Sequence, residues 1–159
     1  MNAEPKSVTT TVEVVVFEID SQRFGVTSDC VRELVRAVAI TALPGAPVGV
    51  DGVIDVRGSI VPVFDLRPRL ALSAAAVRAS EQFLLCSVEA LGLVALRADR
   101  VVEIRQVADV PLPTGSTRDA LVTSLVRLPD GVVVLCDLGA VLSGSDFERL
   151  VRAMEQLAS

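Results

Sequence analysis

The sequence contains no histidine, and this absence excludes several kinds of chemistry. A Ser-His-Asp triad, a Cys-His nucleophile pair and a phosphohistidine intermediate all need an imidazole. A zinc site would need an unusual ligand set. The motifs of a dinucleotide loop, a phosphate-binding loop, a serine hydrolase and a zinc protease are missing too. The sequence therefore predicts a protein that is not an enzyme and that holds no metal or cofactor.

Cysteine is also scarce, with only Cys30, Cys86 and Cys136 in the chain. The three residues are odd in number, far apart and surrounded by apolar neighbours, and none belongs to a CxxC pair. These features predict buried, reduced thiols.

Long apolar runs and basic patches are absent as well. No apolar segment approaches the ~20 residues of a transmembrane helix, and the polar N-terminus lacks the core of a signal peptide. The net charge is -5, and the 15 Lys and Arg residues are scattered among the acids. We therefore expect a cytoplasmic protein that neither inserts into a membrane nor binds nucleic acid.

Short β-branched runs separated by turns make up most of the chain. Its 159 residues, of which 51% are hydrophobic, suffice for one domain or for two small lobes that share a core. Residues 12–19 indicate a strand, and Pro129-Asp130-Gly131 between two apolar runs indicates a hairpin. Residues 29–36 fit helical and alternating spacing equally well. The prediction is a mainly β fold.

The pattern changes in three places. Residues 1–11 are polar and are expected to form a flexible tail before the main domain at 12–142. Residues 67–82 lose the strand pattern and form the expected linker. Residues 143–159 place apolar side chains at helical spacing, which predicts a C-terminal helix.

This C-terminal helix carries its own start signal. Ser145 and Glu148 occupy the positions of a capping box. The apolar stripe that follows either packs on the body of the domain or docks on a partner.

The two halves of the chain resemble each other, which suggests two copies of one β unit of about five short strands. The run SDCVREL in the first half matches ADRVVEI in the second, and RGSIVPVFDL matches PDGVVVLCDL. The matched residues are Asp29 with Asp99, Val31 with Val101, Glu33 with Glu103, Leu34 with Ile104, Leu43-Pro44 with Leu112-Pro113, and Asp65 with Asp137.

The repeat separates scaffold residues from candidate contacts. Asp65 and Asp137 both end an apolar strand, so a turn-capping role is favoured over a catalytic carboxylate pair. Gly58 heads a hairpin, where a positive φ is often required. Arg57 and Pro62 have no counterpart in the second half. A proline inside a strand pattern suggests an edge or a bulge, and an edge near an arginine is a plausible partner site.

The run from Phe24 to Leu70 resembles the CheW-like adaptor domain of bacterial chemotaxis. The second half also fits, through GLVALRADRVVEI and DGVVVLCDL, so that the resemblance covers residues 13–142. The family segments in the first half are Phe24-Gly25-Val26, Val31 to Leu34, Ile40 to Pro44, and Gly52 to Arg67.

The resemblance implies two pseudo-symmetric, five-stranded SH3-like β-barrels, the CheW-like fold, followed here by the C-terminal α-helix. It also implies a non-catalytic adaptor that couples the cytoplasmic tips of chemoreceptors to the regulatory domain of a CheA-type histidine kinase in a membrane-associated array. The residues expected to contact partners are Val31, Glu33, Leu34, Arg57, Gly58 and Pro62.

Two departures from the family pattern bear on partner preference. Asp55 stands where the family often has asparagine, and Arg97 and Arg100 lie near a segment that usually reads V-D-x-V. Arg57 also has a structural alternative, in which it holds the loop carbonyls before Gly58.

Two other functions remain open from the sequence. The same fold could serve an adaptor of a non-flagellar pathway, such as twitching motility or a second-messenger output. It could also bind a small ligand between the barrels.

Overall fold

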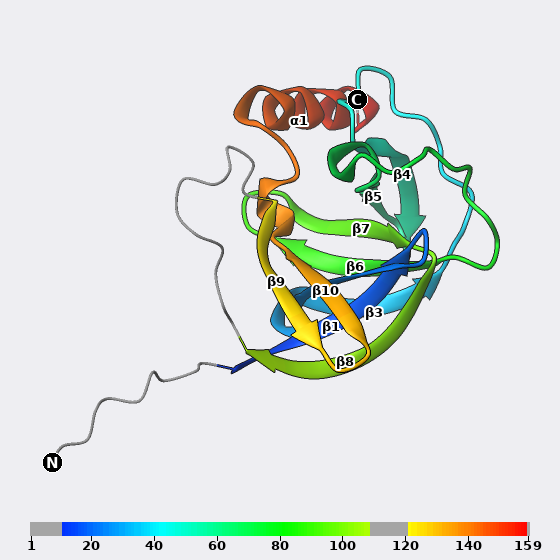
Figure 1. Ribbon diagram of the computed structural model, residues 1–159. Helices are drawn as coiled ribbons and strands as arrows, with labels where there is room; N and C mark the ends of the chain where they lie inside the picture. Colours follow the sequence, from blue (N-terminus) through cyan, green and yellow to red (C-terminus); the bar gives the residue numbers. More distant parts are fainter. Residues whose placement is uncertain (1–10, 109–120, 159) are drawn as a thin grey trace, which may run out of the picture.

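The computed structural model describes residues 11–108 and 121–158, and these residues form a mainly β structure with one C-terminal helix (Figure 1). The expected tail therefore lies outside the described residues except for Thr11, as does the matched pair Leu112-Pro113. None of the described helices is long and apolar enough to span a membrane. The elements are β1 (Thr11–Ile19), β2 (Gln22–Thr27), η1 (Ser28–Cys30), β3 (Val31–Arg36), β4 (Val50–Val56), β5 (Ser59–Phe64), η2 (Pro68–Leu70), β6 (Gln82–Val88), β7 (Gly92–Ala98), β8 (Arg100–Ala108), β9 (Val122–Leu128), β10 (Gly131–Cys136), η3 (Leu138–Ala140) and α1 (Gly144–Ala158).

The strands form two five-stranded sheets, and the predicted fold class is confirmed. Sheet 1 has the order β8-β1-β2-β10-β9, and sheet 2 has the order β3-β6-β7-β5-β4. The two orders coincide when β1 and β2 are matched with β6 and β7, and β8 to β10 with β3 to β5. The ambiguous stretch at 29–36 ends the short helix η1 and then forms β3.

The two halves of the chain exchange strands. Each sheet takes two strands from one half and three from the other, so neither repeat forms a sheet alone. The chain crosses between the sheets twice, through η1 after β2 and through Asp99 after β7. Residues 67–82, the expected linker, connect β5 to β6 within sheet 2 and do not separate the sheets.

The pairing registers confirm the repeat. Glu33 pairs with Leu85 in sheet 2, and its counterpart Glu103 pairs with Val16 in sheet 1. A bulge lies immediately before each glutamate, at the same place in both pairs of strands. The correspondence therefore holds residue by residue and not only at the level of strand order.

The core has three parts, because the central strands are buried on both faces. In β1, Val14 and Val16 point into a cluster inside sheet 1, while Val15 and Phe17 belong to the cluster shared by the two sheets. Each sheet thus curls around its own apolar interior, and the opposite faces pack together. The interior of sheet 2 consists of Ile54, Val61, Val63, Phe83, Leu85 and Ala95.

Helix α1 packs on the body of the domain through Leu150 and Ala153, which are buried in the shared core. The expected capping box is not the cap that forms. The hydroxyl of Ser143 accepts from the Asp146 N–H at 3.2 Å, and the Ser143 carbonyl accepts from Phe147. The helix therefore begins two residues earlier than a cap at Ser145 would allow.

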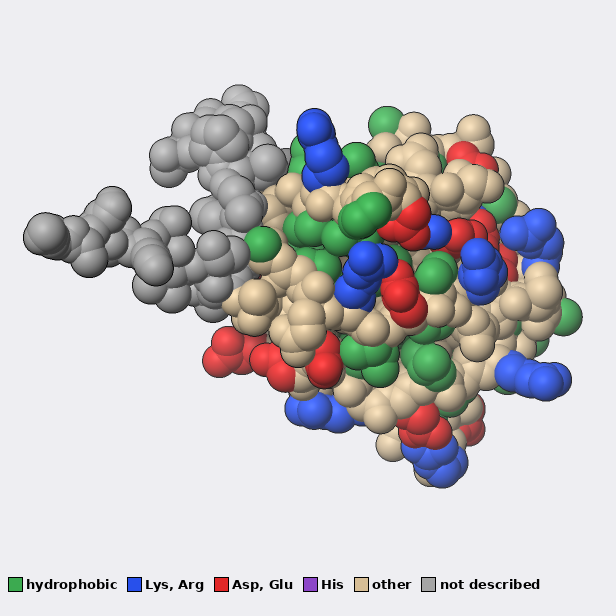
Figure 2. Space-filling model, turned by 60° about the horizontal axis from the view of Figure 1, so that its bottom comes forward, with side chains coloured by type: hydrophobic (Ala, Val, Ile, Leu, Met, Phe, Trp, Pro, Cys, Tyr) green, Lys and Arg blue, Asp and Glu red, His purple; other side chains and the backbone are tan. Residues whose placement is uncertain are grey.

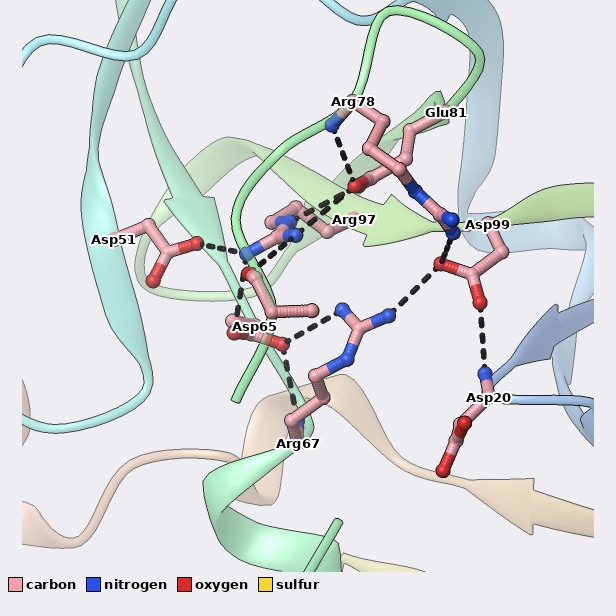
Figure 3. Close-up of polar contacts among 9 residues, drawn as sticks. Asp20, Asp51, Asp65, Arg67, Arg78, Glu81, Arg97 and Asp99 are labelled. Carbon is pink, nitrogen blue, oxygen red and sulfur yellow. Dashed lines mark hydrogen bonds and ion pairs between the residues drawn. The ribbon is translucent and has the colours of Figure 1, made fainter. Parts of the chain in front are cut away.

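A buried ion network fixes the end of sheet 2 (Figure 3). Arg97 on β7 is 2% exposed, and its guanidinium binds carboxylates from three separate segments. It donates to Glu81 at 3.0 and 3.1 Å, to Asp51 at 2.7 Å and to Asp65 at 3.3 Å. Because a charge buried without partners is costly, these segments must all be in place for the guanidinium to remain buried.

The network reaches sheet 1 through Asp99, at one of the two crossings. The Asp99 carboxylate accepts from Arg67 at 2.8 Å and from the backbone N–H of Asp20, in the β1–β2 turn, at 2.8 Å. Burial alone would raise the pKa of Asp99, but the Asp20 N–H and the Arg67 guanidinium outweigh it and lower the pKa. Burial raises the pKa of Asp65.

We predict that Asp99→Asn lowers the free energy of unfolding at pH 7 by about 2 kcal/mol, since charge-assisted hydrogen bonds are lost. A lowered carboxyl pKa gives stability that is present above the ordinary pKa and lost as the pH falls through the lowered value. The gap between wild type and variant should therefore narrow in urea unfolding below about pH 4. Asp29→Asn, at the counterpart crossing, is the control. A gap that does not change with pH would contradict the prediction.

Sheet 2 closes because the segment after β3 returns to β4. Thr41 and Val53 exchange backbone hydrogen bonds of 2.8 and 2.9 Å, which joins the two edges of the sheet. Gly52 makes this approach possible, because a Cβ at that position would overlap the Thr41 carbonyl oxygen. Its φ of +148° also disfavours other residues.

We predict that Gly52→Ala destabilises the protein by about 2–5 kcal/mol through overlap and strain. Gly45→Ala is the matched control, because Gly45 also has a positive φ but has nothing within 4 Å of the added Cβ. That control should cost about 1 kcal/mol. If both variants lost the same free energy of unfolding in thermal or urea experiments, the close approach of Thr41 would not be the reason why glycine is needed at position 52.

Candidate partner-binding surface

Strand β3 presents alternate side chains at an edge of sheet 2. Val31 and Glu33 are half-buried, whereas Leu34 is 44% exposed. This alternation follows from the period of two in a strand. The strand pairs only with β6 along the described chain, so its outer edge is not covered by a third strand there.

The β4–β5 turn supplies two more of the predicted residues. Arg57 has a φ of +49° and Gly58 a φ of +90°, as in the tight turns that connect hairpin strands. The carboxylate of Asp55 accepts from the Gly58 N–H at 2.7 Å. Asp55 therefore stabilises the turn itself.

Arg57 reaches across to β3. Its guanidinium donates to both carboxylate oxygens of Glu33, at 2.7 and 3.2 Å. The alternative in which Arg57 holds its own loop carbonyls is therefore not what the structure shows. The hydrogen bonds from Arg57 lower the pKa of Glu33, and Glu33 raises the pKa of Arg57. Arg57 is largely exposed and Glu33 is half-buried, so the pair orients a surface more than it stabilises the fold.

Pro62 lies apart from this group. It is buried, and it lines a separate groove of about 500 Å³ between β5, the β6–β7 turn and helix α1. The pairing of β5 with β7 covers Val63 and Phe64, so a proline just before them interrupts no described pairing on that side. The structure thus groups Val31, Glu33, Leu34, Arg57 and Gly58, and it places Pro62 elsewhere.

Sequence reasoning did not single out two exposed apolar residues. Val38, just after β3, is 49% exposed, and Ile104 on β8 is 64% exposed. The repeat matches Ile104 with Leu34, and this match could have identified Ile104 as a second candidate contact residue. Figure 2 shows the face that carries β8, where hydrophobic side chains lie between charged ones of both signs. Such a mixture suits protein contact.

The three thiols differ in burial. Cys86 and Cys136 are buried as predicted, and burial raises the pKa of Cys136 to about 12. Cys30 is only half-buried, contrary to the prediction, and a hydrogen bond with Cys86 lowers its pKa. Within 11–108 and 121–158 no group of three Cys, Asp or Glu side chains is arranged so that it could hold a metal ion.

Comparisons with known proteins agree on the family. Residues 13–146 match the model of the CheW-like domain. A probable chemotaxis protein CheW of Rhizobium etli is 30% identical over 141 residues, which cover 86% of this chain and 90% of the relative. Protein FrzA of Myxococcus xanthus is 31% identical over 149 residues, which cover 92% and 89%. The scaffolding protein TtCheW of Thermoanaerobacter tengcongensis has the same fold, with a TM-score of 0.74 at 23% identity, over 86% of this chain and 96% of that one.

We predict that Arg57→Ala returns the pKa of Glu33 upward to its usual range, because the bidentate guanidinium is removed. NMR titration of the side-chain carboxyl carbon measures this directly. The other glutamates act as internal controls, and the thermal midpoint should stay close to that of the wild type. An unchanged Glu33 titration would show that the pair does not form in solution.

Proposed function

The chain belongs to the CheW-like domain family, and on that premise we propose that it is a non-catalytic adaptor that couples chemoreceptors to a CheA-type histidine kinase. The observation that carries the proposal is the match to the family model over residues 13–146. The chemotaxis protein CheW of Treponema pallidum and the probable chemotaxis protein CheW of Rhizobium etli, both similar to this chain, support a role in chemotaxis.

The proposed receptor surface is the group on β3 and the β4–β5 turn. Leu34 supplies exposed apolar area, and the Glu33–Arg57 pair beside it supplies a fixed charged edge. A receptor tip would bury Leu34, and its polar groups would bind to Glu33 or Arg57, either in place of their ion pair or in addition to it. Val31 and Gly58 complete this surface, and Pro62 would act through the separate groove under α1.

The proposed location follows from these partners. An adaptor of this kind works in the cytoplasm beside the membrane-embedded receptors and needs no membrane segment of its own. We propose the kinase regulatory domain as the second partner, since that domain shares the fold.

We predict that the protein binds the regulatory domain of the CheA-type kinase from the same organism, and cosediments with receptors held in nanodiscs. Arg57→Ala should weaken at least one of these interactions by about tenfold, or 1.4 kcal/mol. Arg23→Ala is the control, because Arg23 is another surface arginine paired with an acid, Asp130, on sheet 1. Calorimetry and cosedimentation give the two readouts.

The outcomes separate the function from the site. Binding to neither the kinase domain nor the receptors would overturn the adaptor proposal. Normal binding of Arg57→Ala to both would leave the function standing and remove Arg57 from the contact surface.

A further inference from the structure

The repeat places a filled site and an open site at equivalent ends of the two sheets. At the end of sheet 2, the Arg97 guanidinium is held by Glu81, Asp51 and Asp65 (Figure 3). At the equivalent end of sheet 1 there is a cavity of about 390 Å³.

The registers identify the counterpart of Arg97. In sheet 2, Arg97 pairs with Phe83, and in sheet 1 Thr27 pairs with Val14 at the same position. Both of these sheet 1 residues, Val14 and Thr27, line the cavity. A short threonine thus stands where the other half has an arginine that fills the space.

At three other positions of the site, a charged residue in sheet 2 is also matched by an uncharged residue in sheet 1. Val12 takes the place of Glu81, and Thr123 that of Asp51. Gly139 takes the place of Arg67. Every one of these changes replaces a charged side chain with a shorter uncharged one, and the largest losses of length are at Thr27 and Gly139, where the other half has arginine.

One acid of the filled site is retained, in the same geometry. Asp65 accepts from the N–H two residues later at 3.0 Å, and Asp137 accepts from the Gly139 N–H at 2.9 Å. The backbone N–H of each aspartate donates to a carbonyl at 2.8 Å. In Asp65 the second carboxylate oxygen receives Arg97, whereas Asp137 is exposed and has no ion pair in the described chain.

The cavity walls suit a long cationic side chain. The interior is apolar, with Val26, Leu135 and Leu138 buried beneath it. Asp137 and Glu89 also line the cavity, and both are exposed and supply negative charge. An arginine would lay its aliphatic stem along such walls and keep its head at the carboxylate.

We propose that this cavity receives an arginine side chain from a partner protein, and that Asp137 binds its guanidinium as Asp65 binds that of Arg97. A partner protein is favoured as the source of this arginine, because contacts on the adjoining surface would add to the binding that the cavity and its carboxylate supply. The cavity also adjoins the proposed contact surface, since Cys30 lines it and directly precedes Val31 on β3.

The test uses N-acetyl-arginine amide as the probe, titrated into the ¹⁵N-labelled full-length protein and followed by NMR. We predict saturable shifts of the Thr27, Ser87 and Gly139 amides. N-acetyl-citrulline amide, which is neutral and nearly isosteric, should bind at least tenfold more weakly. The lysine analogue should also bind more weakly, because an ammonium lacks the planar fork.

Two variants locate the binding. Asp137→Asn keeps the Oδ1 acceptor for the Gly139 N–H and removes the charge, so affinity for the probe should fall at least tenfold. Thr27→Arg should fill the cavity from within and abolish binding. Asp146→Asn on α1 removes one negative charge at a distance and should leave the titration unchanged.

Absence of saturable shifts, equal shifts with citrulline, or binding that persists in Thr27→Arg would each overturn the proposal. Equal affinity for the lysine analogue would overturn the assignment to arginine. The titration contains neither kinase nor receptor, so its failure would leave the adaptor proposal standing.

Discussion

The burial of the Arg97 guanidinium is the constraint on which the arrangement of the two sheets depends. Its three acids come from the start of β4, the end of β5 and the segment before β6, so the ion pairs of the guanidinium are complete only when all three segments have folded. Arg67 and Asp99 extend the network to the β1–β2 turn. A local electrostatic requirement thereby becomes a condition on how sheet 2 meets sheet 1.

Because the two halves of the chain exchange strands, the ion network in sheet 2 also constrains sheet 1. Each sheet is built from both repeats, so the sheets are joined by two covalent crossings as well as by the shared core. The crossings are counterparts of each other, but only Asp99 is tied down by ion pairs in the described chain; Asp29 has none. The backbones of the two halves are thus similar, but their side chains differ. The end of sheet 2 is filled by the Arg97 ion network, whereas the equivalent end of sheet 1 has an open cavity at Asp137.

We assign two surfaces to partners. One is the exposed edge of sheet 2 at β3, and the other is the open cavity at Asp137 in sheet 1. Leu34 and the Glu33–Arg57 pair lie on an edge that no further strand covers in the described structure, and the pair holds the β4–β5 turn beside it. The open cavity is close to this edge, because Cys30, the residue before β3, lines it. A β framework that presents a short apolar edge and a cation-accepting cavity suits the proposed adaptor, which would hold two proteins in a fixed relation.

The sequence by itself determined the mainly β class, the internal repeat, the turn roles of Asp65 and Asp137 and the family, since these rest on local pattern and on motifs. It left open whether residues 29–36 are helical, because a short segment fits both periods. Only the tertiary structure decided that the repeats exchange strands, that Arg57 pairs with Glu33, and that Arg97 is buried while its counterpart Thr27 borders a cavity. Those features depend on which distant segments meet, and spacing along one chain does not encode the three-dimensional neighbours of a side chain.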